Sequence, residues 1–318
     1  MKSLGVERIL REFKDQNNFM EVQTSGSTGV PKIIKIEKSH MRASAQMTLD
    51  FLGLQKGNKA LLCMSPAHIG GIMMMMRAEL GDLNLTIVEP SARPLENLEG
   101  NFDFVAMVPY QVAASIDDLH RIKKLIIGGG PISPDLEDQL RNLPNEIYHT
   151  YGMTETISHI AMRRVNGSDN ETFKTLPGIE IYLDERGCLV INAPALGVKD
   201  LATNDLVELK SANSFVWLGR HDNVVNSAGV KLHPESIERK IGDIGYPYFL
   251  AGIPDSKFGE SLVMVVESDE SMEFETFKNR FQALGKYEIP KQIFTVTKFV
   301  MTESGKLNRK ETLNCIAQ

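Results

Sequence analysis

Cysteine is scarce in this sequence, with three residues in a chain of 318. Cys63, Cys188 and Cys315 lie far apart, and no two of them form a CxxC pair. Their number and spacing predict neither a disulfide framework nor a zinc site. A chain of this kind is typical of a reducing compartment, so we expect a cytoplasmic protein.

Long hydrophobic runs are also missing. The longest, residues 69–76, has two glycines inside it and falls well short of the roughly 20 residues that a membrane helix needs. The N-terminus becomes charged within a few residues and lacks the apolar core of a secretory signal. We therefore expect neither export nor association with a membrane.

Positive charge is not in excess. The 35 Lys and Arg residues are outnumbered by 41 Asp and Glu residues, and the formal net charge of -6 disfavours a general nucleic-acid-binding protein. What the sequence does contain is an ordinary globular composition, with 42% apolar and 24% charged residues. At this length the chain can form one large core or two unequal ones.

The first half of the chain alternates between β-prone and helical segments, which predicts an α/β fold. Two β-prone segments flank a Gly/Ser/Thr loop at 24–32, a helical pattern covers 40–53, and a second helix is expected to end at Gly81. Ser133 followed by Pro134 indicates another helix start. Sheets of this kind bind ligands beyond the carboxyl ends of their strands, where the loops at 24–29 and 128–131 fall.

The pattern changes twice further along. Short strands separated by turn residues predict a β-rich subdomain at 175–221, and a small α+β unit follows from residue 222. We therefore predict a large N-terminal α/β domain at 1–221 that includes the β-rich subdomain, followed by a small mobile α+β C-terminal domain at 222–318. The boundary is placed at Arg220 to Asp222.

The loop TSGSTGVPK supplies glycines, four hydroxyls and one lysine, a set suited to binding a nucleotide triphosphate. It lacks the Walker pattern, because Pro31 separates the last glycine from the lysine and no hydroxyl follows. An ordinary P-loop NTPase is thus disfavoured. The candidate phosphate-binding residues are Thr24, Ser25, Gly26, Ser27, Thr28, Gly29 and Lys32.

This loop resembles the phosphate-binding signature of the adenylate-forming superfamily, which includes acyl-CoA synthetases, luciferases and nonribosomal adenylation domains. The resemblance covers nearly all of the chain but only the later part of a typical member, because most of the segment that precedes the loop in the family is absent here. In the family, this segment packs behind the sheet that carries the active site. Its loss is expected to leave a more open pocket, or else an exposed apolar surface, which would favour a homodimer.

Two further motifs follow in the family's order. The turn formed by Gly128, Gly129, Gly130 and Pro131 resembles the glycine turn along the adenine, and YGMTET at 151–156 resembles the YGxTE motif. The second motif offers the Tyr151 ring for stacking on a base, Gly152 beside it, the Thr154 hydroxyl for the α-phosphate, and the Glu155 carboxylate for magnesium. Taken alone, it reads equally well as a turn with a helix cap.

The later motifs complete the resemblance. Asp205, preceded by Asn204 in place of the usual glycine, resembles the family's acceptor for the ribose hydroxyls, and Arg220 resembles its second ribose contact. Asp222 matches the hinge position. MTESGKLNRK resembles the terminal motif whose lysine, here Lys306, stabilises the charge that develops as a carboxylate attacks the α-phosphate.

The resemblance implies an ATP-dependent acid–CoA ligase with magnesium and coenzyme A as cofactors. The carboxylate is first activated as an acyl-adenylate, and a thiol then displaces AMP. The small domain is expected to rotate between these steps, replacing Lys306 by the face around Gly229, which lines the channel of the thiol.

The segment HIGGIMMMMR is the most informative for the acid. His68 is a candidate catalytic and acid-pocket residue, or else a core histidine, and Gly70, Gly71 and Gly128 are assigned to the pocket. With Arg77 two turns further on, the run resembles the o-succinylbenzoate–CoA ligases of menaquinone biosynthesis. An arginine suits a second carboxylate on the substrate, although the helical pattern alone favours an exposed Arg77.

Three other interpretations remain open. The chain could be a ligase for another aromatic or short acid, a stand-alone adenylation protein that loads a carrier thiol, or an inactive nucleotide-binding relative. Retention of Lys32, Glu155, Asp205, Arg220 and Lys306 disfavours the last.

Overall fold

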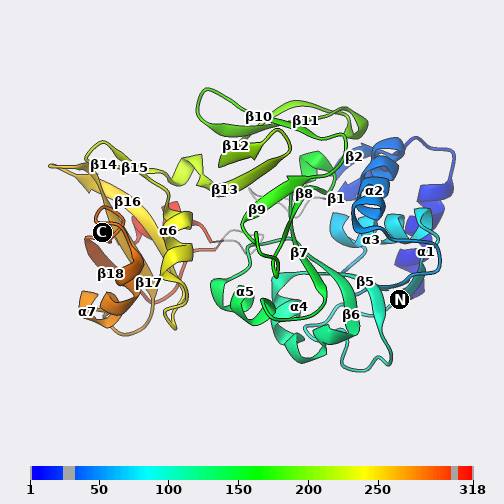
Figure 1. Ribbon diagram of the computed structural model, residues 1–318, viewed down its shortest axis with the longest axis horizontal. Helices are drawn as coiled ribbons and strands as arrows, with labels where there is room; N and C mark the ends of the chain where they lie inside the picture. Colours follow the sequence, from blue (N-terminus) through cyan, green and yellow to red (C-terminus); the bar gives the residue numbers. More distant parts are fainter. Residues whose placement is uncertain (1, 24–32, 302–306, 317–318) are drawn as a thin grey trace.

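The computed structural model describes residues 2–23, 33–301 and 307–316. The chain forms a large body that extends to residue 220 and a smaller one built from the remainder (Figure 1). The expected α/β fold class is confirmed. The structure also shows how the strands connect, which the sequence did not predict.

One eleven-stranded sheet runs through the large body, in the order β10-β11-β12-β13-β9-β8-β7-β6-β5-β3-β4. In this order, the five strands from β4 to β7 pair in parallel with one another. Every pairing on the other side of β7, out to β10 at the far edge, is antiparallel. The strands expected as a β-rich subdomain therefore continue the α/β sheet. The bounds are β3 (Lys59–Leu62), β4 (Asn84–Ile87), β5 (Phe102–Met107), β6 (Ile122–Ile127), β7 (Glu146–Gly152), β8 (His159–Arg164), β9 (Thr172–Thr175), β10 (Glu180–Leu183), β11 (Cys188–Ala193), β12 (Val198–Ser211) and β13 (Ser214–Arg220).

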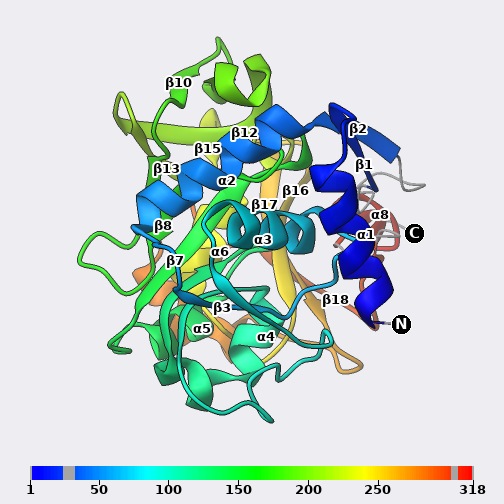
Figure 2. The ribbon, with the colours of Figure 1, turned by 90° about the vertical axis from the view of Figure 1, so that its right-hand side faces the viewer.

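Helices cover both faces of the parallel part. The strands alternate between two cores, since Ala60 and Phe104 face one and Leu61 and Val105 face the other. The first core is closed by three helices that lie side by side, α1, α2 and α3, and the second by α4, α5 and η1 (Figure 2). Their bounds are α1 (Lys2–Lys14), α2 (Lys38–Leu52), α3 (Ile69–Leu80), α4 (Pro109–Ala114), α5 (Pro134–Leu140) and η1 (Ile116–Arg121).

Local sequence signals place several of these elements. Gly53 ends α2 in the left-handed conformation, at φ 59°, which glycine adopts at little cost. Ser133 caps α5, where its Oγ accepts a hydrogen bond from the Leu136 N–H at 3.3 Å. Strands β1 (Phe19–Gln23) and β2 (Ile33–Glu37) pair antiparallel on either side of the glycine-rich segment.

The smaller body has its own sheet, in the order β15-β14-β17-β16, with β18 paired in parallel to β17. Phe277 and Ile237 belong to the core on one face, while Phe249 and Phe299 form the core on the other. The bounds are β14 (Val225–Ser227), β15 (Val230–Leu232), β16 (Tyr248–Asp255), β17 (Gly259–Glu267), β18 (Gln292–Val296), α6 (Pro234–Ile241), α7 (Phe274–Phe277) and α8 (Arg309–Asn314); short helical turns are η2 (Thr154–Thr156), η3 (Pro194–Leu196), η4 (His221–Asn223) and η5 (Lys278–Ala283).

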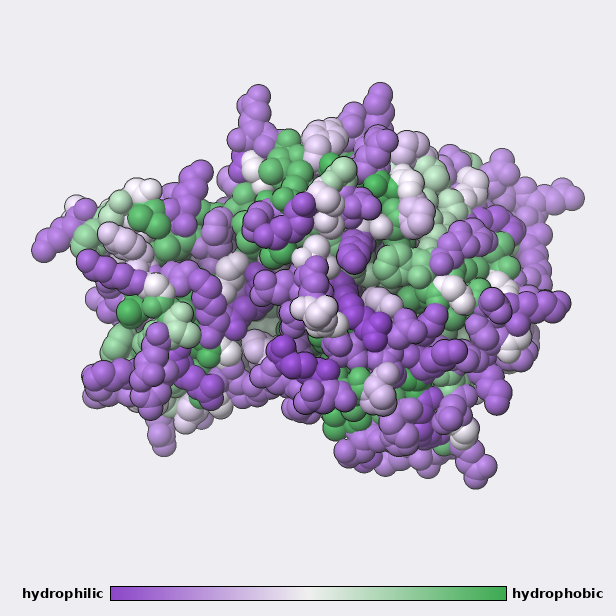
Figure 3. All heavy atoms as spheres, in the orientation of Figure 1, coloured by the Kyte–Doolittle hydropathy of each residue, from purple (hydrophilic) through white to green (hydrophobic). Residues whose placement is uncertain are grey.

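Hydrophilic side chains cover most of the face seen in Figure 3, with smaller apolar patches between them. Within the described residues, no helix is long and apolar enough to cross a membrane.

Helix α6 joins the two bodies by packing on β13. The Ser236 hydroxyl donates to the Leu218 carbonyl at 2.6 Å, and the Arg239 guanidinium donates to the Trp217 carbonyl at 2.7 Å. Gly219 allows this approach, because it adopts φ 152° and a Cβ there would lie 2.4 Å from Glu235 Oε2. The Glu235 carboxylate is not free to move away, since its Oε1 accepts from Asn223 and lies 3.9 Å from Arg309 Nη1.

A Gly219→Ala variant is therefore expected to be less stable. The added methyl group overpacks the contact with α6, and the backbone conformation is strained for alanine, so we expect a loss of about 1–3 kcal/mol. Calorimetric melting measures it. The control is Gly5→Ala in α1, where a Cβ meets nothing within 4 Å and alanine favours the helix. Equal melting temperatures for Gly219→Ala and the wild type would contradict the close contact.

Candidate active site

Two of the expected motifs meet because β6 and β7 are parallel neighbours. The glycine turn at 128–130 follows β6, and Tyr151 and Gly152 end β7, so both lie at the same edge of the sheet. The His149 ring joins them through its Nε2, which lies 3.1 Å from the Gly130 carbonyl oxygen. Burial and the nearby Arg163 lower the pKa of His149 to about 3, which makes this ring neutral at physiological pH.

Glycine is required at two positions in these motifs. A Cβ on Gly128 would lie 2.6 Å from Thr150 Oγ1, and a Cβ on Gly152 would lie 2.4 Å from the Ser158 carbonyl oxygen. The turn that follows Gly152 is held by the buried Thr156, whose hydroxyl donates to the Ser158 carbonyl at 2.8 Å. Thr154 is half-buried and Glu155 is exposed, so both side chains remain accessible to a ligand.

The two expected ribose contacts lie opposite each other, since Asp205 of β12 pairs in register with Arg220 of β13. Asp205 is 7% exposed, and Arg220 Nη1 lies 3.7 Å from its Oδ1. Tyr151 donates its hydroxyl to Oδ2 at 2.7 Å, and Trp217 donates its indole N–H to Oδ1 at 3.1 Å. Burial and the Asp205 charge raise the pKa of the Tyr151 hydroxyl well above its usual range, so it stays a donor.

Trp217 is a site residue that the sequence reasoning missed. It is the chain's single tryptophan and lies three residues before Arg220. Its position close to Arg220, a candidate ribose contact, was the one sequence signal that could have indicated a role at the site. The bond to Asp205 depends on the register between β12 and β13, which a single sequence does not reveal.

The candidate acid-pocket residues are not grouped at one place, since Gly128 follows β6 beside the nucleotide motifs, whereas His68, Gly70 and Gly71 lie after β3, toward the other end of the sheet. His68 precedes α3 as its exposed N-cap residue, and Gly71 lets the helix approach the end of β3, because a Cβ there would lie 2.2 Å from the Ser65 carbonyl oxygen. A Cβ on Gly70 would meet only the Met64 side chain, at 3.6 Å. The fold therefore requires glycine at 71 but not at 70.

Arg77 differs from the expectation of an exposed helix arginine. It is 2% exposed, because α3 packs against both α1 and α2, and this expectation was wrong. Its Nη2 donates to Ser158 Oγ at 2.8 Å, its Nε has no partner, and no carboxylate among the described residues pairs with it. Burial lowers the pKa of Arg77 to about 10, so the guanidinium is still charged at neutral pH.

Ser158 connects Arg77 to the YGMTET turn. The residue before it, Ile157, adopts φ 67°, a conformation that costs a β-branched residue about 1–3 kcal/mol. The residue after Ser158, His159, forms two hydrogen bonds. Its Nδ1 lies 3.4 Å from Ser158 Oγ and its Nε2 lies 3.0 Å from Thr48 Oγ1. Burial and the Arg77 charge lower the pKa of His159, so Arg77 faces a neutral ring.

Two groups of predicted residues lie outside the described ones, namely the phosphate-loop residues Thr24 to Lys32 and the catalytic Lys306. Gly229 is described, at φ 79° in the two-residue turn with Ala228 that joins β14 to β15. This turn type needs left-handed residues, which explains the glycine. Asp222 lies in η4, 3.1 Å from Arg220 Nη2.

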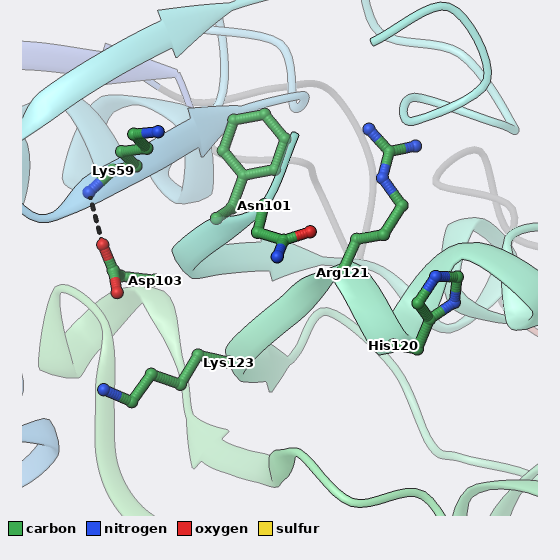
Figure 4. Close-up of a pocket in the computed structure, with 7 residues that line it drawn as sticks. Lys59, Asn101, Asp103, His120, Arg121 and Lys123 are labelled. Carbon is green, nitrogen blue, oxygen red and sulfur yellow. Dashed lines mark hydrogen bonds between the residues drawn. The ribbon is translucent and has the colours of Figure 1, made fainter. Parts of the chain in front are cut away.

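A cavity of about 360 Å³ lies away from all these residues, at the amino ends of β3, β5 and β6. Lys59, Lys123 and His120 give it a basic lining, and Figure 4 shows the Lys59 main-chain N–H donating to Asp103 Oδ2, at 2.8 Å. Its arginine, Arg121, is already used by the main-chain carbonyls of Leu95, Leu98 and Gly100. The cavity is therefore not the candidate active site, which lies at the opposite edge of the sheet.

The fold and the grouped motifs define a nucleotide-dependent ligase, and comparison with known proteins agrees. The sequence model of the AMP-binding enzyme family matches residues 16–194. The chain belongs to this family, and the expected class of ATP-dependent, AMP-forming acid–CoA ligase is confirmed.

Solved and curated relatives are similar over most of their length. The chain is 35% identical to an AMP-forming acyl-CoA synthetase/AMP-acid ligase II-like protein from Dyadobacter fermentans, covering 98% of this chain and 93% of that one at a TM-score of 0.68. It is 26% identical to the 2-succinylbenzoate–CoA ligase of Lactococcus lactis, over 94% of this chain and 72% of the relative. The o-succinylbenzoate coenzyme A synthetase of Bacillus subtilis, solved with ATP and magnesium, shares the fold at 20% identity, with coverages of 92% and 69% and a TM-score of 0.78.

Proposed function

We propose that this acid–CoA ligase activates o-succinylbenzoate, with ATP, magnesium and coenzyme A, as a step of menaquinone biosynthesis. The curated relatives that act on 2-succinylbenzoate support the choice of acid. The observation that carries it in this chain is the buried guanidinium of Arg77.

A buried cation without an acidic partner is costly to maintain. The last turn of α3 offsets part of this cost, because a helix C-terminus favours positive charge. Ser158 accepts from Nη2, and among residues 2–23, 33–301 and 307–316 no acceptor reaches Nε. The second carboxylate of o-succinylbenzoate supplies the missing acceptor and the missing negative charge.

The nucleotide residues fit ATP by the chemistry of their donors and acceptors. An ionised carboxylate accepts about four hydrogen bonds, and Tyr151 and Trp217 use one on each oxygen of Asp205. One acceptor position per oxygen remains, which matches the two ribose hydroxyls. Open space at Gly130 leaves room for the base along the glycine turn, since a Cβ there would meet nothing within 4 Å.

Magnesium would be held by Glu155 and the phosphates. The described residues contain no cluster of three His, Cys, Asp or Glu residues able to hold a metal. A single exposed carboxylate suits magnesium, which is commonly bound by one or two carboxylates together with substrate phosphates. When bound, the ion would neutralise charge on the phosphates of ATP.

The reaction proceeds in two balanced steps. An oxygen of the succinyl carboxylate attacks the α-phosphorus, the bond to pyrophosphate breaks, and Lys306 and Thr154 stabilise the developing charge. The coenzyme A thiolate then attacks the acyl carbon, and AMP leaves with the bonding electron pair. His68, at the start of α3, is placed beside the acid in this proposal.

We place the hinge between these steps at Asp222, with domains at 1–221 and 222–318. The two bodies have separate cores, which supports this division. Between them the chain passes through η4, where Arg220 and Asp222 form an ion pair. The face around Gly229 replaces Lys306 for the thiol step.

The test of the acid is ATP–pyrophosphate exchange with o-succinylbenzoate, benzoate, acetate and a medium-chain fatty acid, followed by the mass of the product formed with coenzyme A. We expect o-succinylbenzoate to give the highest kcat/KM. Absence of exchange with this acid alone would reject the substrate and leave the class intact.

An Arg77→Met enzyme is expected to lose about thirtyfold in kcat/KM for o-succinylbenzoate, because a charge-assisted hydrogen bond is worth roughly 2 kcal/mol. ATP binding, measured by calorimetry, should stay within twofold and serves as the folding control. Arg77→Lys should recover part of the activity, since it restores the charge without the planar fork. An equal loss of ATP affinity and of kcat/KM for o-succinylbenzoate would contradict a specific role of Arg77 in binding the acid.

A further inference from the structure

Trp217 contacts two parts of the molecule that have different tasks. Its indole N–H donates to Asp205 Oδ1 at 3.1 Å, inside the large body. Its main-chain carbonyl accepts from Arg239 Nη2 at 2.7 Å, and the Arg239 guanidinium lies 5.8 Å from the centroid of its ring. Arg239 belongs to α6, a helix of the small body. Trp217 therefore contacts both bodies, and we call their interface at β13 and α6 the seam.

The bond to Asp205 fixes the carboxylate. Each carboxylate oxygen accepts one protein donor, Tyr151 on Oδ2 and Trp217 on Oδ1, and together they set its rotation about the Cβ–Cγ bond. A carboxylate held in this way presents its remaining acceptor positions in one direction. Loss of the indole N–H leaves that direction dependent on Tyr151 alone and leaves Arg220, at 3.7 Å, free to draw Oδ1 toward itself.

The contact with Arg239 fixes the indole. A guanidinium within about 6 Å of a tryptophan ring is attracted by the ring's negative face. Arg239 Nη2 is itself held by Ser236 Oγ at 3.1 Å, and Ser236 donates to the Leu218 carbonyl beside Trp217. The position of α6 therefore influences where the indole N–H points.

We infer that Trp217 is a positioning residue that couples ribose binding at Asp205 to the placement of α6 and the small domain. The inference rests on the proposed nucleotide site. It adds to that proposal a physical link, because a ligand that favours one position of Asp205 also favours one position of the indole. By reciprocity, the factor by which bound nucleotide favours one position of α6 equals the factor by which that position of α6 raises the affinity for the nucleotide.

The first experiment compares ATP binding by calorimetry in the wild type and in Trp217→Phe, which keeps an aromatic ring and removes the N–H. We expect ATP to bind about tenfold more weakly, the effect of losing one hydrogen bond to a charged group. In pyrophosphate exchange, KM for ATP should rise by a similar factor, while KM for the acid and kcat change by less than twofold. A loss of packing alone would instead lower the melting temperature and reduce both steps together.

The second experiment uses the intrinsic fluorescence of Trp217, which is the chain's single tryptophan and therefore reports from one place. Addition of ATP to the wild type should shift its emission. In Arg239→Gln the emission should differ before ATP is added, and ATP should bind about threefold more weakly. Arg42→Gln is the matched control, because it removes a similar contact, Arg42 over Phe13 at 4.2 Å, far from the seam. It should leave both emission and ATP affinity unchanged.

The double variant Trp217→Phe with Arg239→Gln completes a cycle. Coupling predicts that the double variant binds ATP no more weakly than Trp217→Phe alone. Additive losses would overturn the link through Trp217, as would wild-type affinity in Trp217→Phe. A wild-type protein that binds no ATP would overturn the proposed nucleotide site together with this inference, and that outcome is distinct from the other two.

Discussion

An Asp205→Asn enzyme is expected to lose about 150-fold in kcat/KM for ATP. Asparagine keeps the shape of the side chain, but its Nδ2 is a donor that faces either the Tyr151 hydroxyl or the Trp217 N–H, both of which donate at this site. One oxygen no longer accepts a ribose hydroxyl, and the other loses its charge. Losing charge-assisted hydrogen bonds of this kind costs about 3 kcal/mol.

Calorimetry with ATP and the KM for ATP in pyrophosphate exchange measure the effect. Asp200→Asn in the same strand is the matched control, because Asp200 is exposed and its carboxylate accepts a hydrogen bond from Tyr182, at 2.9 Å, far from the ribose candidates. Its positive φ of 48° is also well tolerated by asparagine. ATP binding by Asp205→Asn within threefold of the wild type would remove Asp205 from the ribose site.

A Lys306→Ala enzyme is expected to lose adenylation about a thousandfold, as when one preorganised donor to a developing oxyanion is removed. Lys306 itself lies outside the described residues, but the chain on both sides of it is anchored. Met301 and Leu307 form a β-bridge. Arg309 donates to the Leu250 carbonyl at 3.0 Å and to Glu238 Oε2 at 2.9 Å. The described residues on either side of Lys306 are therefore attached to the small body.

The same variant should convert a supplied acyl-adenylate to the thioester at a rate within threefold of the wild type, because the proposal assigns Lys306 to the first step only. Exchange of labelled pyrophosphate measures one step, and release of AMP on addition of coenzyme A measures the other. Lys310→Ala, an exposed residue of α8, is the control and should retain both. Equal loss of the two half-reactions would reject the rotation of the small domain.

Local signals predicted much of the fold. The period of apolar residues located α2 and α3, and Gly53 and Ser133 marked a helix end and a helix start. Helix α1 was missed although its signal is present, since Val6, Ile9, Leu10 and Phe13 follow the helical period and pack on the first core.

Long-range pairing could not be predicted in the same way. The continuation of the α/β sheet into β13 depends on the pairing of β13 with β9, about forty residues earlier in the chain. The burial of Arg77 depends on α2 and on Ser158, 81 residues away. The family motifs predicted which residues would form the site, whereas strand register determined their partners. The hinge at Asp222, the role of Lys306 and the homodimer stay predictions.

The single sheet has a consequence for how this enzyme can change its substrate. Helix α3, which carries Arg77, follows β3 near one end of the sheet, and Asp205 lies on β12 near the other. The hydrogen-bonded strands between them fix the distance from Arg77 to Asp205. If the acid binds at Arg77 as proposed, a longer or shorter acid would be accommodated by exchanging side chains along α3, and selection for new acids should concentrate there and leave the strands unchanged.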